Sequence, residues 1–378
     1  MTSSLKLLRE LVAIPSVNPA FLPAGDPRAG EQRVAEFLAA TAARGGLDIA
    51  FQKVFRGRAN LLARLPARGP ARRHILLAPH MDTVGDPAMR PSLFEPTLRN
   101  GRLYGRGACD TKGSIAAMLT ALLQVARSRR GPAHTEITLA ALVDEENSQS
   151  GSRALVNSGF SADLAIVGEP TRLQVVTAHK GDLWLKLETR GKSAHGARPE
   201  LGRNAVHAMA KIVNLLETEY ADQLRQRRHP LLGHPTVNVG SISGGTQPNI
   251  VPAHCAISID RRTLPGETEE GVNSELKALF AKHKLKAELI STKNAPCLPL
   301  ETNPNLPLVQ EFLTGVGQTR PVGVDFFCDA AVLARGGIPS IVFGPGDIAQ
   351  AHTADEWISL ASLDRATDLL TQFLLSQP

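Results

Sequence analysis

Three consecutive carboxylates, Asp144, Glu145 and Glu146, directly follow an apolar run at residues 137–143. Adjacent carboxylates repel one another, and the stretch 137–151 contains no basic residue that could neutralise them. Either the three acids form a solvated loop, or a cation binds beside them. For Asp144 the sequence indicates no role beyond a solvated or hydrogen-bonded lead-in.

Histidine or acidic side chains follow other apolar runs in the same way. The runs are residues 74–78, 164–167 and 338–343, and the side chains that follow them are His80 with Asp82, Glu169, and His352. Imidazole and carboxylate groups suit zinc, and a carboxylate can also bridge two ions. Asp82 could accept the second N–H of the His80 imidazole and fix its tautomer.

The apolar runs predict buried strands of an α/β fold. Helical patterns at residues 32–43, 114–126 and 360–374 alternate with them, which indicates a mostly parallel, doubly wound sheet. Ligands bind outside the carboxyl ends of the strands in such a sheet. The sequence therefore predicts that the polar residues after the four runs meet at one edge.

Asp110 lies in the segment GRGACDTKG, just before the helical pattern at residues 114–126. A lone aspartate before a helix is usually an N-cap. Taken with His80, Glu146, Glu169 and His352, however, it completes the five ligands that two neighbouring cations need. Since burying uncompensated acids is costly, we interpret the set as a metal site.

The middle of the chain predicts a second, smaller domain. Strand and helix patterns occur there in the order β-α-β-β-α-β, at residues 182–188, 204–217, 236–243, 254–262, 270–282 and 286–292. This order gives an antiparallel sheet with two helices on one face. We expect residues 178–292 to be inserted into a catalytic domain formed by residues 1–177 and 293–378.

Composition excludes several other classes of protein. The 378 residues contain no apolar run of about 18, so we expect no membrane span, and the N-terminus resembles an amphipathic helix rather than a signal peptide. Four well-separated cysteines argue against disulfides and thiolate zinc sites and favour the cytoplasm. A net charge of +6 with 4% aromatic residues does not indicate a nucleic-acid surface.

Five segments in chain order resemble the motifs of the M20 family of dinuclear zinc hydrolases. They are HMDTV, GRGACDTKG, DEENSQSG, GEP and GPGDIAQAHTADE. The resemblance implies two Zn²⁺ ions, for which Co²⁺ can substitute. It assigns His80, Asp110 and Glu169 to one ion, and the bridging Asp110 with Glu146 and His352 to the other. It also implies that Glu145 is the general base and that the peptide bond after Asp110 is cis.

The predicted inserted domain carries further similarity to this family. The segment GKSAHGARPELGRNAV resembles the one whose histidine, here His195, reaches the active site of the partner subunit, so the resemblance implies a homodimer. GGTQPNIVP and DRRTLPG resemble segments with a substrate-binding asparagine and arginine, here Asn249 and Arg262. A guanidinium group matches a substrate carboxylate in a bidentate manner.

The resemblance implies a metal-dependent amide hydrolase acting on a small N-acylated amino acid. The ending GPGDIAQAHTADEW is closer to the acetylornithine deacetylase branch and favours removal of an acetyl group, in amino-acid (arginine) biosynthesis. The alternatives are a succinyl-diaminopimelate desuccinylase, a carboxypeptidase or dipeptidase, and an inactive metal-binding scaffold. A dinucleotide-binding enzyme is disfavoured because GRGACD lacks the third glycine of G-x-G-x-x-G.

Overall fold

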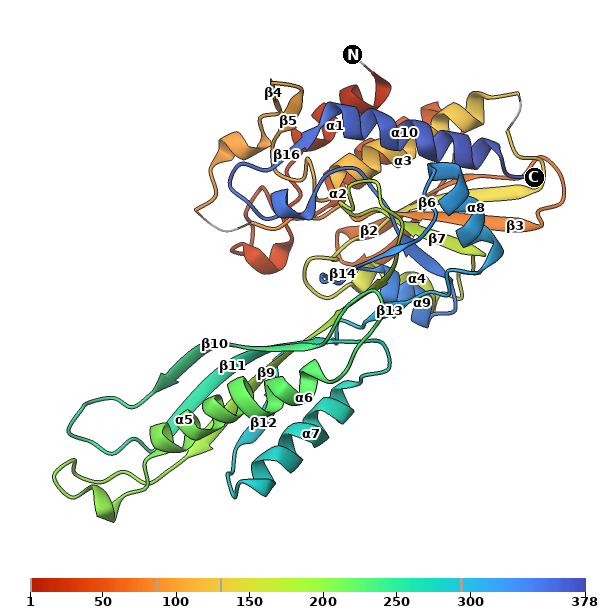
Figure 1. Ribbon diagram of the computed structural model, residues 1–378. Coiled ribbons are helices and arrows are strands. Elements are labelled where there is room, and N and C mark those ends of the chain that lie inside the picture. Colours follow the sequence, from red (N-terminus) through yellow and green to blue (C-terminus); the bar gives the residue numbers. More distant parts are fainter. Residues whose placement is uncertain (1, 86–87, 130, 293–294) are drawn as a thin grey trace. The chain divides into compact units, whose positions relative to one another are not determined.

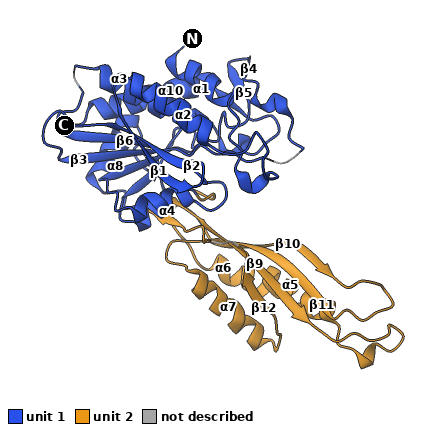
Figure 2. Ribbon diagram, turned by 180° about the vertical axis from the view of Figure 1, so that it is seen from behind, with its two compact units in different colours: residues 1–177, 302–322, 328–378 blue, residues 178–301, 323–327 orange. Residues whose placement is uncertain are grey.

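The computed structural model describes residues 2–85, 88–129, 131–292 and 295–378 (Figure 1). The chain divides into two compact units (Figure 2). The first comprises Met1–Thr177, Thr302–Val322 and Cys328–Pro378, and the second comprises Ala178–Glu301 and Gly323–Phe327. No helix within the described ranges is long and apolar enough to cross a membrane.

A mixed sheet forms the centre of the first unit, and some residues at one edge of it are assigned to the second unit. Its described strands run in the order β1 (Asp48–Phe55), β2 (Arg58–Leu65), β6 (Thr135–Ala141), β3 (Arg73–Ala78), β7 (Leu164–Val167), β15 (Ser340–Val342), β8 (Val176–His179), β13 (Leu300–Glu301), and β14 (Val322–Val324) pairs with β8. The central strands β6, β3, β7 and β15 pair in parallel. The predicted mostly parallel α/β fold is thus confirmed, with antiparallel pairs toward both edges.

Helices cover both faces of this sheet. Figure 1 shows α1 (Ser3–Val12), α3 (Lys112–Arg127) and α10 (Leu360–Leu375) over one face and α4 (Ser150–Asn157) and α9 (Ala330–Arg335) over the other. The remaining helices of the unit are α2 (Gln32–Arg44), α8 (Pro307–Val316) and the short turns Pro19–Phe21, Pro91–Phe94 and Ile348–Gln350. Because α3 is covered by α1, α10 and the sheet, residues 112–122 of this helix are all buried.

Aromatic packing joins the last elements of the chain to the sheet. The Phe312 ring of α8 lies edge-on to Phe343, which follows β15, with ring centroids 5.1 Å apart. It lies edge-on to Phe373 of α10 as well, at 4.8 Å. Each such pair adds about 0.5–1.5 kcal/mol beyond the burial of its apolar area. This packing fixes the end of β15, from which the chain continues to His352.

A three-stranded antiparallel sheet lies beside the main one and consists of β4 (Thr97–Arg99), β5 (Arg102–Tyr104) and β16 (Trp357–Ser359). Trp357 pairs with Tyr104, and Ser359 pairs with Arg102. This pairing brings the chain after His352 alongside the chain before Asp110, although about 250 residues separate them in the sequence.

The second unit contains an antiparallel sheet in the order β10 (Thr236–Gly244), β11 (His254–Thr263), β9 (Gly181–Arg190) and β12 (Glu288–Ser291). Its helices α5 (Ala205–Leu215) and α7 (Glu269–Lys282) lie on one face, as expected from the β-α-β-β-α-β pattern (Figure 1). The first helix runs beyond the predicted end at residue 217, through Leu216–Tyr220 into α6 (Ala221–Arg225). Buried Leu216, Tyr220 and Leu224 explain the extension, since their spacing of four continues its apolar face.

Candidate metal centre

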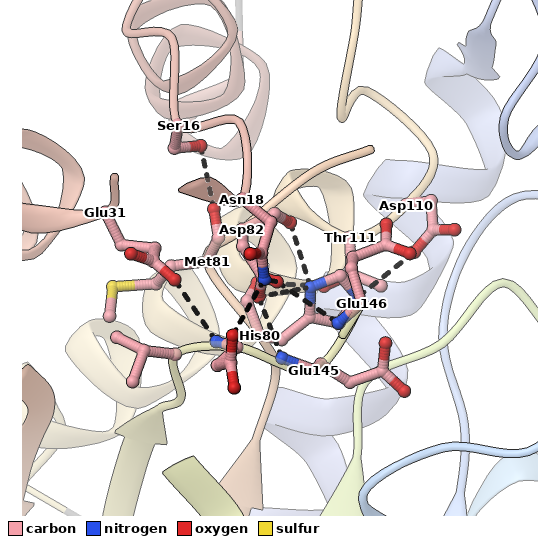
Figure 3. Close-up of polar contacts among 12 residues, drawn as sticks. Ser16, Asn18, Glu31, His80, Met81, Asp82, Asp110, Thr111, Glu145 and Glu146 are labelled. Carbon is pink, nitrogen blue, oxygen red and sulfur yellow. Dashed lines mark hydrogen bonds and ion pairs between the residues drawn. The ribbon is translucent and has the colours of Figure 1, made fainter. Parts of the chain in front are cut away.

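The carboxyl ends of four parallel strands deliver the polar residues singled out in the sequence. Ala78 of β3 is opposite Val167 of β7, which is opposite Val342 of β15, so these strands end level with one another. The chain then continues from β3 to His80, from β6 to the three acids, from β7 to Glu169 and from β15 to His352. Figure 3 shows several of these side chains converging.

His80, Asp110 and Glu169 form the first group that could hold a metal ion. One ligand atom from each lies within 4.8 Å of the others, and all three residues are buried. His80 Nε2 is 3.1 Å from Asp110 Oδ1 and 3.8 Å from Glu169 Oε1. A set of one imidazole and two carboxylates fits a divalent cation such as zinc.

Asp110 also belongs to the second group, together with Glu146 and His352. His352 Nε2 is 3.3 Å from Asp110 Oδ2 and 3.2 Å from Glu146 Oε2. The two carboxylate oxygens of Asp110 therefore face different groups, which suits a bridging ligand. Two further oxygens, Glu146 Oε1 and Glu169 Oε1, are buried without a hydrogen-bond partner. Burying such oxygens without a partner is costly, so these two oxygens are suited to bind a cation.

The charge of the site reflects its burial. Burial raises the pKa of Glu145 and of Glu169 well above the usual range for glutamate, and it raises the pKa of Glu146 to about 7. Hydrogen bonds to Asp110 and Glu146 raise the pKa of His352 to about 10. The carboxylates thus need positive charge nearby in order to be ionised together at neutral pH.

The contact between Asp82 and the His80 imidazole differs in one detail from the one expected from the sequence. His80 Nδ1 lies 3.0 Å from the main-chain oxygen of Asp82 and 3.4 Å from its carboxylate. The carboxylate instead accepts the backbone N–H groups of Glu145 and Glu146, each at 3.1 Å (Figure 3). The expected contact with the imidazole is thus made mainly by the Asp82 carbonyl. Its carboxylate fixes the backbone that carries the two glutamates.

The loop that carries Asp110 is held by Glu356, a buried residue that the sequence reasoning missed. The Glu356 carboxylate accepts the backbone N–H groups of Gly107, Cys109 and Asp110 at 2.8–3.0 Å, and it pairs with Arg106 at 2.9 Å. Thr111, rather than Asp110, is the residue before α3, and the Asp110–Thr111 peptide is cis, as the resemblance implies. Glu356 is the last residue of the segment GPGDIAQAHTADE, and this membership is the signal in the sequence that could have singled it out.

Asp144 is buried, and both oxygens of its carboxylate accept hydrogen bonds. Its Oδ1 accepts hydrogen bonds from Arg58 at 3.1 Å and from Asn18 at 3.0 Å, and its Oδ2 accepts one from Ser150 at 2.6 Å. Its backbone N–H donates to Glu31 at 3.1 Å. The prediction that Asp144 is solvated is thus wrong, and the alternative prediction that it is hydrogen-bonded is confirmed. Ser150 is six residues away in the sequence, but Arg58, Asn18 and Glu31 lie 86 to 126 residues away, so no local pattern could indicate these three.

Tertiary contacts close the loop that contains the three acids. Asn60 of β2 accepts the N–H of Val143 at 3.1 Å and donates to the carbonyl of Gly151 at 2.8 Å. Gly151 donates in turn to the carbonyl of Val143 at 3.0 Å. A Cβ atom at Gly151 would lie 2.5 Å from that carbonyl oxygen, so this close approach requires glycine.

The remaining candidate residues lie in the second unit. His195 and Asn249 are exposed on neighbouring segments, which are joined by a 2.8 Å hydrogen bond from the N–H of Gly196 to the carbonyl of Asn249. Arg262, on β11, places both arms of its guanidinium on Asp260, at 2.9 and 3.1 Å. The predicted roles of these three residues in substrate binding and catalysis stay predictions.

Comparison with known proteins identifies the family. The profile of Peptidase family M20/M25/M40 matches residues 76–376. The acetylornithine deacetylase of Proteus mirabilis (strain HI4320) is 33% identical over 98% of this chain and 95% of its own. The enzyme of the same name from Myxococcus xanthus is 33% identical over 83% and 82%.

Solved structures share the fold. The aminopeptidase PepT from Bacillus cereus ATCC 10987 has a TM-score of 0.79 at 23% identity, covering 99% of this chain and 97% of its own. The M20 family metallo-carboxypeptidase Sso-CP2 from Sulfolobus solfataricus has a TM-score of 0.77 at 22% identity, covering 99% of each chain. With the profile match and the clustered ligand residues, these findings show that the chain belongs to the M20/M25/M40 peptidase family and is a metallo-hydrolase.

Proposed function

We propose that this hydrolase removes the acetyl group from an Nα-acetylated amino acid such as N-acetylornithine, a reaction of arginine biosynthesis. The observation that carries the proposal is the 33% identity to an acetylornithine deacetylase along 98% of the chain. The peptidases with a similar fold are less than 25% identical to it, so they support the architecture and not a peptide substrate.

The proposed centre holds two zinc ions, or two cobalt ions in their place. His80, Asp110 and Glu169 would bind one ion, and Asp110, Glu146 and His352 would bind the other. Bound zinc supplies Lewis acidity and lowers the pKa of water to about 7. Asp82 would keep the two glutamates in place through their backbone N–H groups.

Glu145 is the proposed proton carrier of the reaction. Its carboxylate would accept a proton from the attacking water and then deliver it to the nitrogen of the leaving amine. Burial raises the pKa of Glu145 well above the usual range for glutamate, which favours uptake of a proton by its carboxylate. Glu146, the next residue, faces His352 and would act as a ligand instead.

The second unit supplies the proposed substrate contacts. Arg262 would bind the carboxylate of the amino acid, exchanging part of its pairing with Asp260 for the substrate. Asn249 would donate to the substrate from its exposed position. His195 would act in the active site of the partner subunit in a homodimer, where it would stabilise the developing negative charge. These assignments are supported by the resemblance of their segments to those of the family.

A hydrolysis panel tests the proposed substrate. Purified protein loaded with zinc or cobalt would be assayed with N-acetylornithine, N-acetylcitrulline, N-succinyl-diaminopimelate and simple dipeptides, while metal content is measured in the same samples. We expect the highest kcat/KM for N-acetylornithine. A preference for the succinylated compound would assign a desuccinylase, and a preference for dipeptides would assign a peptidase. No turnover with two metal ions bound would contradict the proposal altogether.

A further inference from the structure

A largely buried guanidinium group, that of Arg58, pairs with the first of the three acids. Arg58, at the start of β2, makes a bidentate pair with Glu31, with both contacts at 2.6 Å. The same guanidinium reaches Asp144 at 3.1 Å. The Glu31 side chain is fully buried, and the Arg58 side chain is only 13% exposed. We call Arg58, Glu31 and Asp144 the Arg58 cluster.

Three hydrogen bonds, which run through Asn18 and Asp82, connect the Arg58 cluster to the candidate base. Asn18 donates from one amide nitrogen to Asp144 at 3.0 Å and to Asp82 at 2.7 Å. Asp82 in turn accepts the backbone N–H of Glu145 at 3.1 Å (Figure 3). Asn18 is fully buried, and every group named here has its partner within the first unit.

The cluster also holds the backbone at the point where the chain turns from β6 toward Glu145. Asp144 has a φ of 68°, which is in the left-handed region that a residue with a side chain seldom adopts. Its N–H donates to Glu31, and its carbonyl accepts the N–H groups of Ser148 and Gln149. The strained conformation persists because the N–H, the carbonyl and the carboxylate of Asp144 are all hydrogen-bonded.

Electrostatics make Arg58 the critical member of the cluster. Three buried carboxylates, Glu31, Asp82 and Asp144, lie in one connected network, and Arg58 is the cation that contacts two of them directly. Removing one partner from a buried ion pair leaves an uncompensated charge, and the structure then rearranges to expose or neutralise it. Asp144, one of the two carboxylates that would lose this partner, is the residue directly before Glu145.

We propose that Arg58 is a positioning residue for Glu145: it neutralises Glu31 and Asp144 and thereby fixes the backbone that aims the base. This inference rests on the proposed function, in which Glu145 carries the proton. Arg58 is not a member of either candidate ligand group. It acts through Asp144, Asn18 and Asp82.

The experiment replaces Arg58 with glutamine in the full-length protein loaded with zinc. Outer groups that orient an active site usually contribute about 10- to 100-fold in activity. We expect Arg58→Gln to lower kcat by this factor, with KM changed less than about twofold and metal content per folded chain unchanged. Arg64→Gln is the matched control, because Arg64 lies on the same strand but is half exposed and pairs only at the surface, with Asp48 and Glu136. It should retain the wild-type kcat.

A double variant separates positioning from general stability. In Glu31→Gln combined with Arg58→Gln, the amide replaces the carboxylate that lost its partner, so we expect kcat to recover several-fold over Arg58→Gln alone. Should Arg58→Gln not fold, Arg58→Lys is measured by the same criteria, because lysine keeps the charge but cannot make the bidentate contact.

Three kinetic outcomes would overturn the proposal. They are a wild-type kcat in the folded variant, a rise in KM at unchanged kcat, and a loss of activity that only follows a loss of metal. If the wild-type protein hydrolyses no compound of the panel, the proposed function fails separately. The positioning role is then judged from a crystal structure of Arg58→Gln, in which an undisplaced Glu145 would refute it.

Discussion

The three neighbouring acids at residues 144–146 have three different environments. Asp144 is buried against Arg58 and Asn18, Glu146 faces His352, and the Glu145 side chain is buried with a strongly raised pKa. Adjacent residues in an irregular segment point in different directions, so sequence proximity does not make them one charged patch. Asp144 pairs with Arg58 and Glu146 with His352, so these two acids have separate partners rather than a single shared cation.

At the residue scale, exchanging the two glutamates one at a time separates their proposed roles. Glu145→Gln should keep two metal ions per chain and lose about 10²- to 10⁴-fold in kcat, because the amide cannot accept a proton. Glu146→Ala should instead lose metal, since it removes one of the candidate ligands. Activity assays together with elemental analysis check both outcomes.

Asn147→Ala serves as the control for these two variants, because Asn147 is exposed in the same loop and its side-chain amide donates to the hydroxyl of Ser148. It should retain both metal and activity. A fully active Glu145→Gln protein would remove Glu145 from the mechanism. Unchanged metal content in Glu146→Ala would remove Glu146 from the ligand set.

At the element scale, burial on both faces made some strands easy to predict and others invisible. The apolar run at residues 164–167 coincides with β7, a central strand with every residue buried. By contrast, β1 and β2 were not predicted. The exposed and half-exposed positions of β1 alternate irregularly, and its Phe51 and Phe55 are exposed, so its pattern resembles a surface segment. Its partner and register depend on tertiary contacts that the sequence does not display.

The pairing of β5 with β16 has a measurable consequence for the loop that carries Asp110. Glu356, the residue before β16, is the acceptor for three backbone N–H groups of that loop. Glu356→Gln keeps the shape but loses the charge that strengthens these hydrogen bonds and pairs with Arg106. We expect zinc affinity to fall by about 10- to 100-fold, measured by competition with a chelator.

Asp355→Asn provides the matched control for Glu356→Gln. Asp355 is exposed next to Glu356, so its substitution should leave zinc affinity unchanged. Equal affinities in both variants and in the wild type would show that the Asp110 loop keeps its conformation without the Glu356 carboxylate.

At the scale of the whole molecule, the metal-free protein should lose stability as the pH rises. The pKa of Glu146 is about 7 in the folded state against 4.5 in the unfolded chain, because burial disfavours its charged form. A group whose pKa is raised on folding stabilises the folded state fully below pH 4.5, and this stabilisation is lost as the pH rises through about 7. From this residue alone, the free energy of unfolding should fall by about 3 kcal/mol between about pH 5 and about pH 8.

Chelator-treated and zinc-loaded protein would be compared by denaturant unfolding across this pH range. Zinc should abolish the fall, since a cation favours the ionised carboxylates, and metal-free Glu146→Gln should show a smaller fall than metal-free wild type. If the free energy of unfolding of the metal-free protein stayed constant or rose with pH, the expected destabilisation by ionised buried acids would be contradicted.

Four candidate metal residues, His80, Glu146, Glu169 and His352, could be predicted because each follows an apolar run that marks a strand. Asp110 was singled out instead by its place before a helical pattern. The residues that support them could not be predicted. Asn18, Glu31 and Arg58 lie in the first 58 residues, outside any strand end that the sequence revealed, and their partners lie far along the chain. Their types, an amide, an acid and a base, are common at protein surfaces. Only the folded arrangement shows that Asn18 and Glu31 are buried and that the Arg58 side chain is largely buried with them.

The order of the candidate ligands along the chain affects when the centre can form during synthesis. His80, Asp110, Glu146 and Glu169 precede the second unit, whereas His352 follows it. Chains are synthesised at about 5–20 residues per second, so His352 leaves the ribosome on the order of tens of seconds after His80. A nascent chain therefore exposes most of its ligands before the last one exists. The second candidate group is consequently completed only late in the synthesis of the chain.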